Sequence, residues 1–306
     1  MKQYLKGPIK IAVSSCLAGE AVRYDGTNKQ NTIITNQFSR YFDLHSVCPE
    51  VAIGLGVPRK PINIIQLNGN YSLVDKQNLT LNYTTRMISY AKHQINNFNS
   101  ICGYVVKERS PSCGFKKTPR FSSDGVIIKQ GSGLFTEQIS INLPWVPIIS
   151  ESGLALNKQQ DNFLERIFIL HIWNIICKKN KQYNEFYDRV KHQIEIRGIG
   201  LNSLRNLMDN TNIQQSNNFI SEIMTILKIP ITKTMQINFL NLQLQKNSIT
   251  SERMKTLILN YQHGETTLLD VIQQFQKIFE KKNIKNCSNY FYPDEREIIS
   301  REFYFG

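Results

Sequence analysis

The chain has 306 residues, of which 41% are hydrophobic and 20% charged, and its formal net charge is +13. This composition is that of a globular protein with a sizeable core, and the length predicts two domains. No signal-peptide pattern is found near residue 1, and the most apolar later stretch, residues 167–177, is too short and too polar to cross a bilayer. We therefore expect a cytoplasmic protein with no membrane segment. The positive charge lies mainly in residues 1–150 and favours a polyanionic partner such as nucleic acid, with a solvated basic surface as the alternative.

The first half of the chain alternates short apolar strands with helical or loop segments. The predicted strands cover residues 8–14, 45–47, 103–106 and 145–149. Apolar residues recur at steps of three and four between residues 78 and 98, which predicts an amphipathic helix. This alternation predicts an α/β domain with a mainly parallel sheet over residues 1–160.

The second half of the chain has helical periodicity. The predicted helices cover residues 163–178, 182–196, 217–227, 250–264 and 266–281. Pro230 stops the third of these helices, and Thr250 or Ser251 can cap the fourth. We therefore predict an all-α domain over residues 161–306.

Cysteines follow three segments of the first domain. Cys16 and Cys48 each follow a predicted strand directly, and Cys113 follows the strand 103–106 after a polar loop. Because sites in parallel sheets form beyond the carboxyl ends of the strands, the three sulfurs can converge. Thiolates are soft ligands that favour zinc, copper(I) or iron–sulfur clusters, and three of them leave one metal position open. Their spacing is not that of a zinc ribbon or a ferredoxin, so buried cysteines without metal remain the alternative.

The chain holds six cysteines in all. A cytosolic environment keeps thiols reduced, so they do not predict a disulfide framework. Cys102, Cys177 and Cys287 lie in apolar or tail contexts, and we predict that they pack as small hydrophobic side chains.

Polar residues flank the second and third candidate ligands. Glu50 follows Cys48 by two residues and can activate water, or it can stabilise the first turn of a helix. Residues 107–114 read Lys-Glu-Arg-Ser-Pro-Ser-Cys-Gly, an unusually polar loop for a core segment. Ser110 or Ser112 can position a substrate or pass a proton there, and turn formation is the alternative.

Three signatures in consistent order resemble the DUF523 family, which includes thiouracil desulfidases of the TudS type. They are Ser14–Glu20 with Val22–Gly26, Cys48–Val51 with Gly54–Arg59, and Arg109–Gly114. The resemblance covers about residues 9–160. It implies that Cys16, Cys48 and Cys113 hold a [4Fe–4S] cluster with one iron open to the sulfur of the substrate.

The same resemblance assigns further residues. Glu50 is implied as the catalytic carboxylate and Ser110 as the hydroxyl that assists it, in a reaction that replaces sulfur on a thiolated uracil without net electron transfer. One position departs from the family pattern. The usual Gly-Gly-His-Lys stands here as Gly-Thr-Asn-Lys, so that Asn28 replaces the histidine.

The helical half resembles DUF1722, a domain often fused to DUF523, through residues 228–241, 261–264 and 292–293. The fused arrangement is similar to RudS-type enzymes, which convert 4-thiouridine in tRNA to uridine, whereas free-standing TudS proteins act on thiouracil bases. It implies tRNA as the partner, and thiouracil compounds as the other substrate class.

A base in structured tRNA must be turned outward for such chemistry, so the pocket should combine cations with a stacking surface. Arg23, Lys107 and Arg109 are the candidate cations, with a solvated rim as the alternative. A nucleic-acid or protein-binding module with a purely structural metal is the rival function, and its closed site would show four protein ligands.

Overall fold

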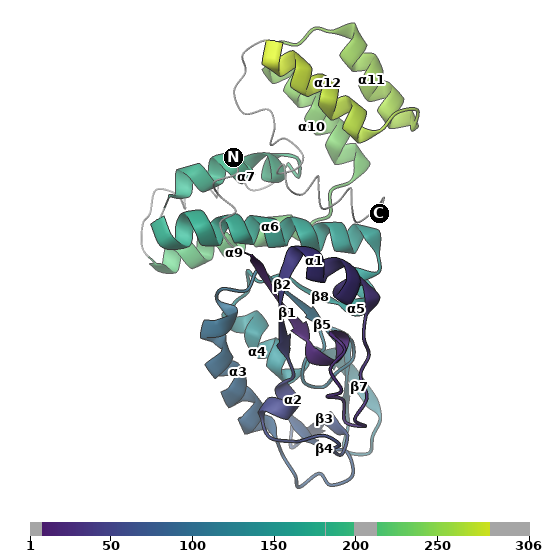
Figure 1. Ribbon diagram of the computed structural model, residues 1–306, viewed down its shortest axis with the longest axis vertical. Helices are drawn as coiled ribbons and strands as arrows, with labels where there is room; N and C mark the ends of the chain where they lie inside the picture. The colour runs from purple at the N-terminus through teal and green to yellow at the C-terminus, as the bar shows by residue number, and fades with distance from the viewer. Residues whose placement is uncertain (1–7, 181, 199–212, 282–306) are drawn as a thin grey trace. The chain divides into compact units, whose positions relative to one another are not determined.

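The computed structural model describes residues 8–180, 182–198 and 213–281 (Figure 1). The structure divides into two compact units, residues 1–174 and 175–306, and the division falls inside helix α6 (Asn157–Asn180). The predicted domains change over at residue 160, near the start of this helix, and that boundary stays a prediction. No helix in the described ranges is long and apolar enough to cross a membrane.

A four-stranded sheet, sheet A, forms the centre of the first unit, with the strand order β2-β1-β5-β8. Its strands are β1 (Ile9–Ser14), β2 (Phe42–Val47), β5 (Gly103–Val106) and β8 (Ile148–Ser150). All neighbouring pairs are parallel. The two central strands, β1 and β5, are buried almost throughout, as expected where both faces of a parallel sheet are covered. The predicted fold class, an α/β domain with a mainly parallel sheet followed by helices, is confirmed.

Helices α3 (Thr84–Phe98) and α4 (Leu134–Asn142) pack together beside sheet A (Figure 1). An aromatic cluster joins them to the sheet. The rings of Phe98 and Phe135 have centroids 5.7 Å apart, and each contacts Tyr104 of β5 edge-on, at 5.3 and 6.3 Å. All three side chains are almost fully buried, so this cluster packs α3 and α4 against the sheet.

Helix α6 lies close to β5 at Gly103. A Cβ atom at this glycine would lie 2.9 Å from side-chain atoms of both Phe163 and Ile167. Because successive residues of a strand point to opposite faces, Gly103 admits α6 on one face of the sheet while Tyr104 meets α3 and α4 on the other.

The remaining short elements of the first unit lie in the connections. They are η1 (Ser15–Leu17), η2 (Ile33–Phe38), α1 (Ser39–Tyr41), α2 (Pro49–Ala52) and α5 (Glu151–Leu154).

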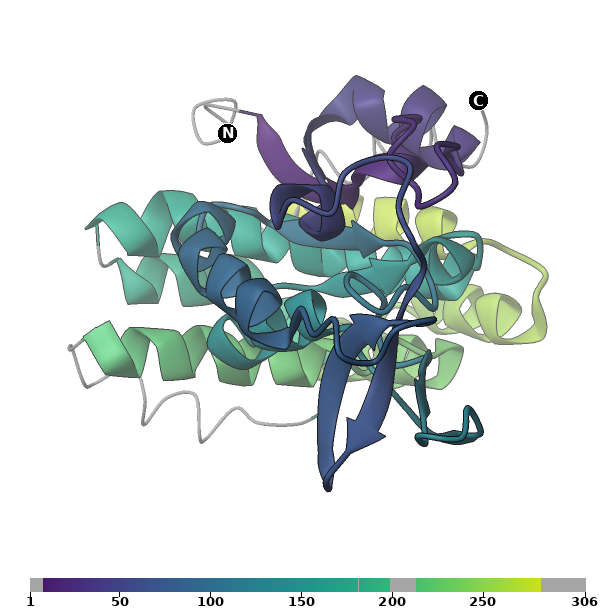
Figure 2. The same cartoon turned by 90° about the horizontal axis from the view of Figure 1, so that it is seen from below.

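A second sheet, sheet B, was not predicted. It has the order β4-β3-β6-β7, with β3 (Ile62–Leu67), β4 (Asn70–Asp75), β6 (Thr118–Phe121) and β7 (Ile127–Gly131). The β3–β4 and β6–β7 pairs are antiparallel, and β3 and β6 are parallel. Asn68 and Gly69, both with positive φ, form the turn between β3 and β4, which Figure 2 shows as two blue arrows projecting from the unit. An Asn-Gly pair between apolar runs is a strong hairpin signal, and it was the available clue.

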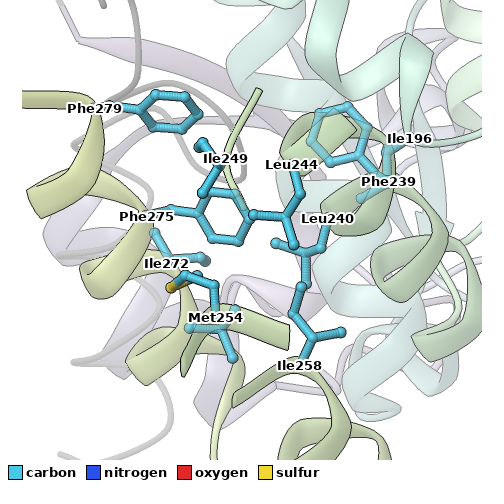
Figure 3. Close-up of a cluster of buried hydrophobic side chains, with 11 residues drawn as sticks. Ile196, Phe239, Leu240, Leu244, Ile249, Met254, Ile258, Ile272, Phe275 and Phe279 are labelled. Carbon is cyan, nitrogen blue, oxygen red and sulfur yellow. The ribbon is translucent and has the colours of Figure 1, made fainter. Parts of the chain in front are cut away.

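The second unit is helical. Its described helices are α7 (Tyr183–Glu195), α9 (Ile213–Leu227), α10 (Lys233–Lys246), α11 (Glu252–His263) and α12 (Leu268–Lys281). Four of them match predicted helices, whereas α10 was missed. Side chains of α10, α11 and α12, among them Leu240, Met254 and Phe275, form one buried apolar cluster (Figure 3).

Replacing Phe135 with alanine should lower the free energy of unfolding by about 3–5 kcal/mol, because it leaves a cavity among buried rings. The matched control is Ile141→Ala on the same helix, since Ile141 is 65% exposed and its loss should change stability by less than about 0.5 kcal/mol. Denaturant unfolding of the two variants measures the difference. Equal stabilities would show that the aromatic cluster does not hold α4 on sheet A.

Candidate functional site

Three cysteines meet at one end of sheet A. Cys16 lies in η1 directly after β1, Cys48 directly precedes α2 after β2, and Cys113 follows the loop after β5. These strands are parallel neighbours, so their carboxyl ends lie at the same edge. All three cysteines line one cavity of about 380 Å³. Cys102 and Cys177 are buried elsewhere, as predicted, and Cys287 lies outside the described residues.

The three thiols of the cavity influence one another electrostatically. Burial raises the pKa of Cys16 to about 12, with further contributions from the Cys113 and Cys48 sulfurs and an opposing one from Lys107. Burial is also the main cause that raises the pKa of Cys48 and of Cys113. In the protein without metal these groups are therefore neutral thiols at neutral pH. As thiolates they would need a positive partner, and iron in a cluster provides one.

The donor set consists of soft sulfur ligands. Within the described ranges, no group of three or more His, Cys, Asp or Glu side chains is arranged to hold one metal ion. A [4Fe–4S] cluster takes one thiolate on each of several irons, and thiols from three segments that line one cavity are donors of the kind it requires.

A carboxylate is fixed at the edge of the same cavity. Glu50 stands in the first turn of α2, and its Oε2 accepts a hydrogen bond from Arg59 Nε at 2.8 Å and lies 2.7 Å from Arg59 Nη2 in the same ion pair. Its Oε1 accepts one from the hydroxyl of Ser112 at 2.6 Å. The Arg59 side chain is only 6% exposed and also donates to the carbonyl of Gly56. Charge-assisted bonds on both oxygens leave Glu50 little rotational freedom.

Ser110 is one step further from the carboxylate. Its hydroxyl lies 3.0 Å from that of Ser112, and it accepts the backbone N–H groups of Ser112 and Cys113 at 3.3 and 3.2 Å. Ser110 therefore stabilises the turn, the alternative role expected from the sequence. It is also linked to Glu50 through Ser112. The residue in direct contact with Glu50 is Ser112.

The turn before α4 fixes the loop that carries these serines. A Cβ atom at Gly133 would lie 2.5 Å from the backbone C and O of Ser112 and 2.8 Å from the carbonyl oxygen of Ser110. The backbone N–H of Gly133 donates to the carbonyl of Gly114 at 2.9 Å. The glycine thus allows two backbone segments to touch and holds the loop in place.

The predicted cations line the cavity but differ in their partners. Arg23 pairs with Asp25 at 3.1 Å, and Lys107 pairs with Glu151. Arg109 is exposed, and it forms no ion pair with any residue that the structure describes. It is therefore the most available of the three for an anionic group.

Tyr24 was missed as a site residue. It is the single aromatic residue among those that line the cavity in the described part of the chain, and 43% of it is exposed. The guanidinium of Arg23 lies over its ring, 5.4 Å from the centroid. The backbone N–H of Arg59 donates to the carbonyl of Tyr24 at 2.8 Å, which ties this ring to the residue that holds Glu50. The available signal was a tyrosine directly after the candidate cation Arg23, in the Arg-Tyr-Asp-Gly segment.

Asn28, at the position of the family's histidine, makes hydrogen bonds within its own loop. Its amide donates to the carbonyl of Gly19 at 3.0 Å and its oxygen accepts the N–H of Gln30 at 3.2 Å. It is not among the residues that line the cavity.

Comparisons with known proteins agree on the first half of the chain. Residues 11–151 match the model of a family described as 2-thiouracil desulfurase. None of the curated proteins matches the chain. A solved structure described as the [4Fe–4S]-dependent thiouracil desulfidase TudS is 30% identical to it over 48% of this chain and 93% of that chain, with a TM-score of 0.39. Through its residues 11–151, the chain belongs to the 2-thiouracil desulfurase family.

Proposed function

We propose that the protein is a [4Fe–4S]-dependent desulfidase that replaces the sulfur of a thiolated uracil with oxygen, acting on 4-thiouridine in tRNA. The observation that carries the proposal is the meeting of three thiols, two of them buried and one half-buried, and one fixed carboxylate in a single cavity. The family match of residues 11–151 supports the same reaction class.

Cys16, Cys48 and Cys113 are the residues that would hold the cluster. When bound, a [4Fe–4S] cluster with three protein thiolates supplies one iron without a side-chain ligand, a soft Lewis acid suited to the exocyclic sulfur of the substrate.

Glu50 is the general base of the proposed reaction. A water molecule adds to the ring carbon that bears sulfur, and its proton passes to the Glu50 carboxylate. The C–S bond then breaks with its electron pair remaining on sulfur, so that the products are uridine in the tRNA, or uracil from a free base, and sulfide, and no electron is gained or lost overall. Arg59 orients Glu50, and the hydroxyls of Ser112 and Ser110 extend the hydrogen-bonded path along which that proton can move.

The rim of the cavity would bind the rest of the substrate. Tyr24 offers a ring on which a pyrimidine can stack, and Arg109 offers an exposed cation for a phosphate. The net charge of +13 and the resemblance of the helical half to DUF1722 support tRNA over a free base. Part of that resemblance, residues 292–293, lies outside the described residues.

The proposal is tested on protein purified without oxygen. We expect a brown protein with about four irons per chain. It should release sulfide from thiolated tRNA, and more slowly from 4-thiouracil. Nucleoside analysis measures the loss of 4-thiouridine from the tRNA. Cys16→Ala, Cys48→Ala and Cys113→Ala should each lose iron, while Cys102→Ala, at a buried cysteine outside the cavity lining, should keep it. A colourless zinc protein that releases no sulfide would support the binding module instead.

Glu50→Gln should lower kcat by about 10²–10⁴-fold, because the amide cannot accept the proton. Arg59→Lys should lower kcat less, since lysine cannot make both contacts to Oε2. Both variants should keep their iron, which absorption spectra measure alongside sulfide release. A Glu50→Gln protein that turns over at the wild-type rate would remove this carboxylate from the chemistry.

Tyr24→Leu should raise KM for 4-thiouracil by about 5- to 150-fold with little change in kcat, since stacking is worth about 1–3 kcal/mol per base. Tyr24→Phe keeps the ring and is the matched control, with KM near that of the wild type. If leucine and phenylalanine behave alike, the substrate does not stack at this position.

A further inference from the structure

We propose that Ser14 is a positioning residue whose hydroxyl hydrogen-bonds to the sulfur of Cys113 and thereby makes the iron bound by that cysteine more electron-poor. This inference rests on the cluster of the proposed function, and it assigns to Ser14 a role separate from binding the metal.

The hydroxyl of Ser14 lies within hydrogen-bond distance of the sulfur. Ser14 is the last residue of β1, and its Oγ donates to Cys113 Sγ at 3.2 Å. The same Oγ accepts the backbone N–H of Lys107, directly after β5, at 3.0 Å. A hydroxyl has one proton, so an N–H on its acceptor side leaves that proton for the sulfur. The parallel pairing of β1 and β5 therefore sets the direction of the bond.

The contact is shielded from water. Ser14 is 1% exposed and Cys113 is 6% exposed. Tyr104, which is fully buried, lies beside both groups: burial and the charge of Cys113 raise the pKa of its hydroxyl, and the neighbouring hydroxyls of Ser14 and Thr136 lower it. With no water to compete for the sulfur, the hydrogen bond from Ser14 retains most of its strength.

Cys113 differs from the other two cysteines in having hydroxyl donors, since both Ser14 and Ser110 lie at its sulfur. No hydrogen bond to the sulfur of Cys16 occurs within the described part of the chain, and the sulfur of Cys48 has the backbone N–H of Val51 as a donor while its thiol donates weakly to the carbonyl of Val22 at 3.9 Å. A buried hydroxyl donor at one of three thiolates draws electron density from the iron bound there. The expected results are a higher reduction potential and a stronger Lewis acid at the open iron.

The test compares holoproteins of the wild type, Ser14→Ala and Ser14→Thr. Loss of the hydroxyl should shift the reduction potential to more negative values and move an Fe–S(Cys) stretching band in the resonance Raman spectrum to higher frequency, at unchanged iron content. Threonine keeps the hydroxyl and should restore both values. Ser15→Ala is the neighbouring control, since its hydroxyl makes no hydrogen bond within the described residues and its loss should leave both values unchanged.

A Ser14→Ala protein with the wild-type potential and the wild-type Fe–S band overturns the inference. Should alanine prevent folding, Ser14→Val matches the shape of threonine without its hydroxyl, and a shift relative to Ser14→Thr supports the inference while none overturns it. A wild-type protein without iron would instead refute the proposed function, so the two failures are distinguishable.

Discussion

The parallel pairing of β2, β1 and β5 is the constraint on which the site depends. Cys16 and Cys113 lie 97 residues apart in the chain, and only the shared edge of sheet A brings them to one cavity. Because side chains alternate along a strand, a shift of one residue in this pairing would turn the following residues to the other face. The near-continuous burial of β1 and β5 opposes such a shift, so the core of the sheet also stabilises the geometry of the thiols.

The cavity places thiols and a carboxylate close together. Burial disfavours negative charge on the thiols, as the raised pKa of Cys16 shows, while the carboxylate of Glu50 lies two residues after Cys48. The buried guanidinium of Arg59 pairs with Glu50, and a cluster, if bound, would supply the positive charge that the thiolates need. The two charge balances would then be made by different partners.

Sequence reasoning located what depends on short stretches of chain and missed what depends on the fold. The apolar runs of β1 and β5 and the cysteines after them were predictable because each is a local pattern. Sheet B was missed because β7 is mostly exposed and gives no alternation of apolar and polar residues. The contact between Arg59 and Glu50 could not be predicted either, since it depends on how the loop between them turns, with Gly54 and Gly56 at positive φ.

The tight approach of Gly133 to Ser112 has a consequence for how this site can change. A side chain at position 133, even a methyl group, would push against the backbone of Ser112 and so move the hydroxyl that contacts Glu50. Position 133 is therefore restricted to glycine by backbone contact, whereas Tyr24 and Arg109 are exposed at the entrance and can be exchanged without that restriction.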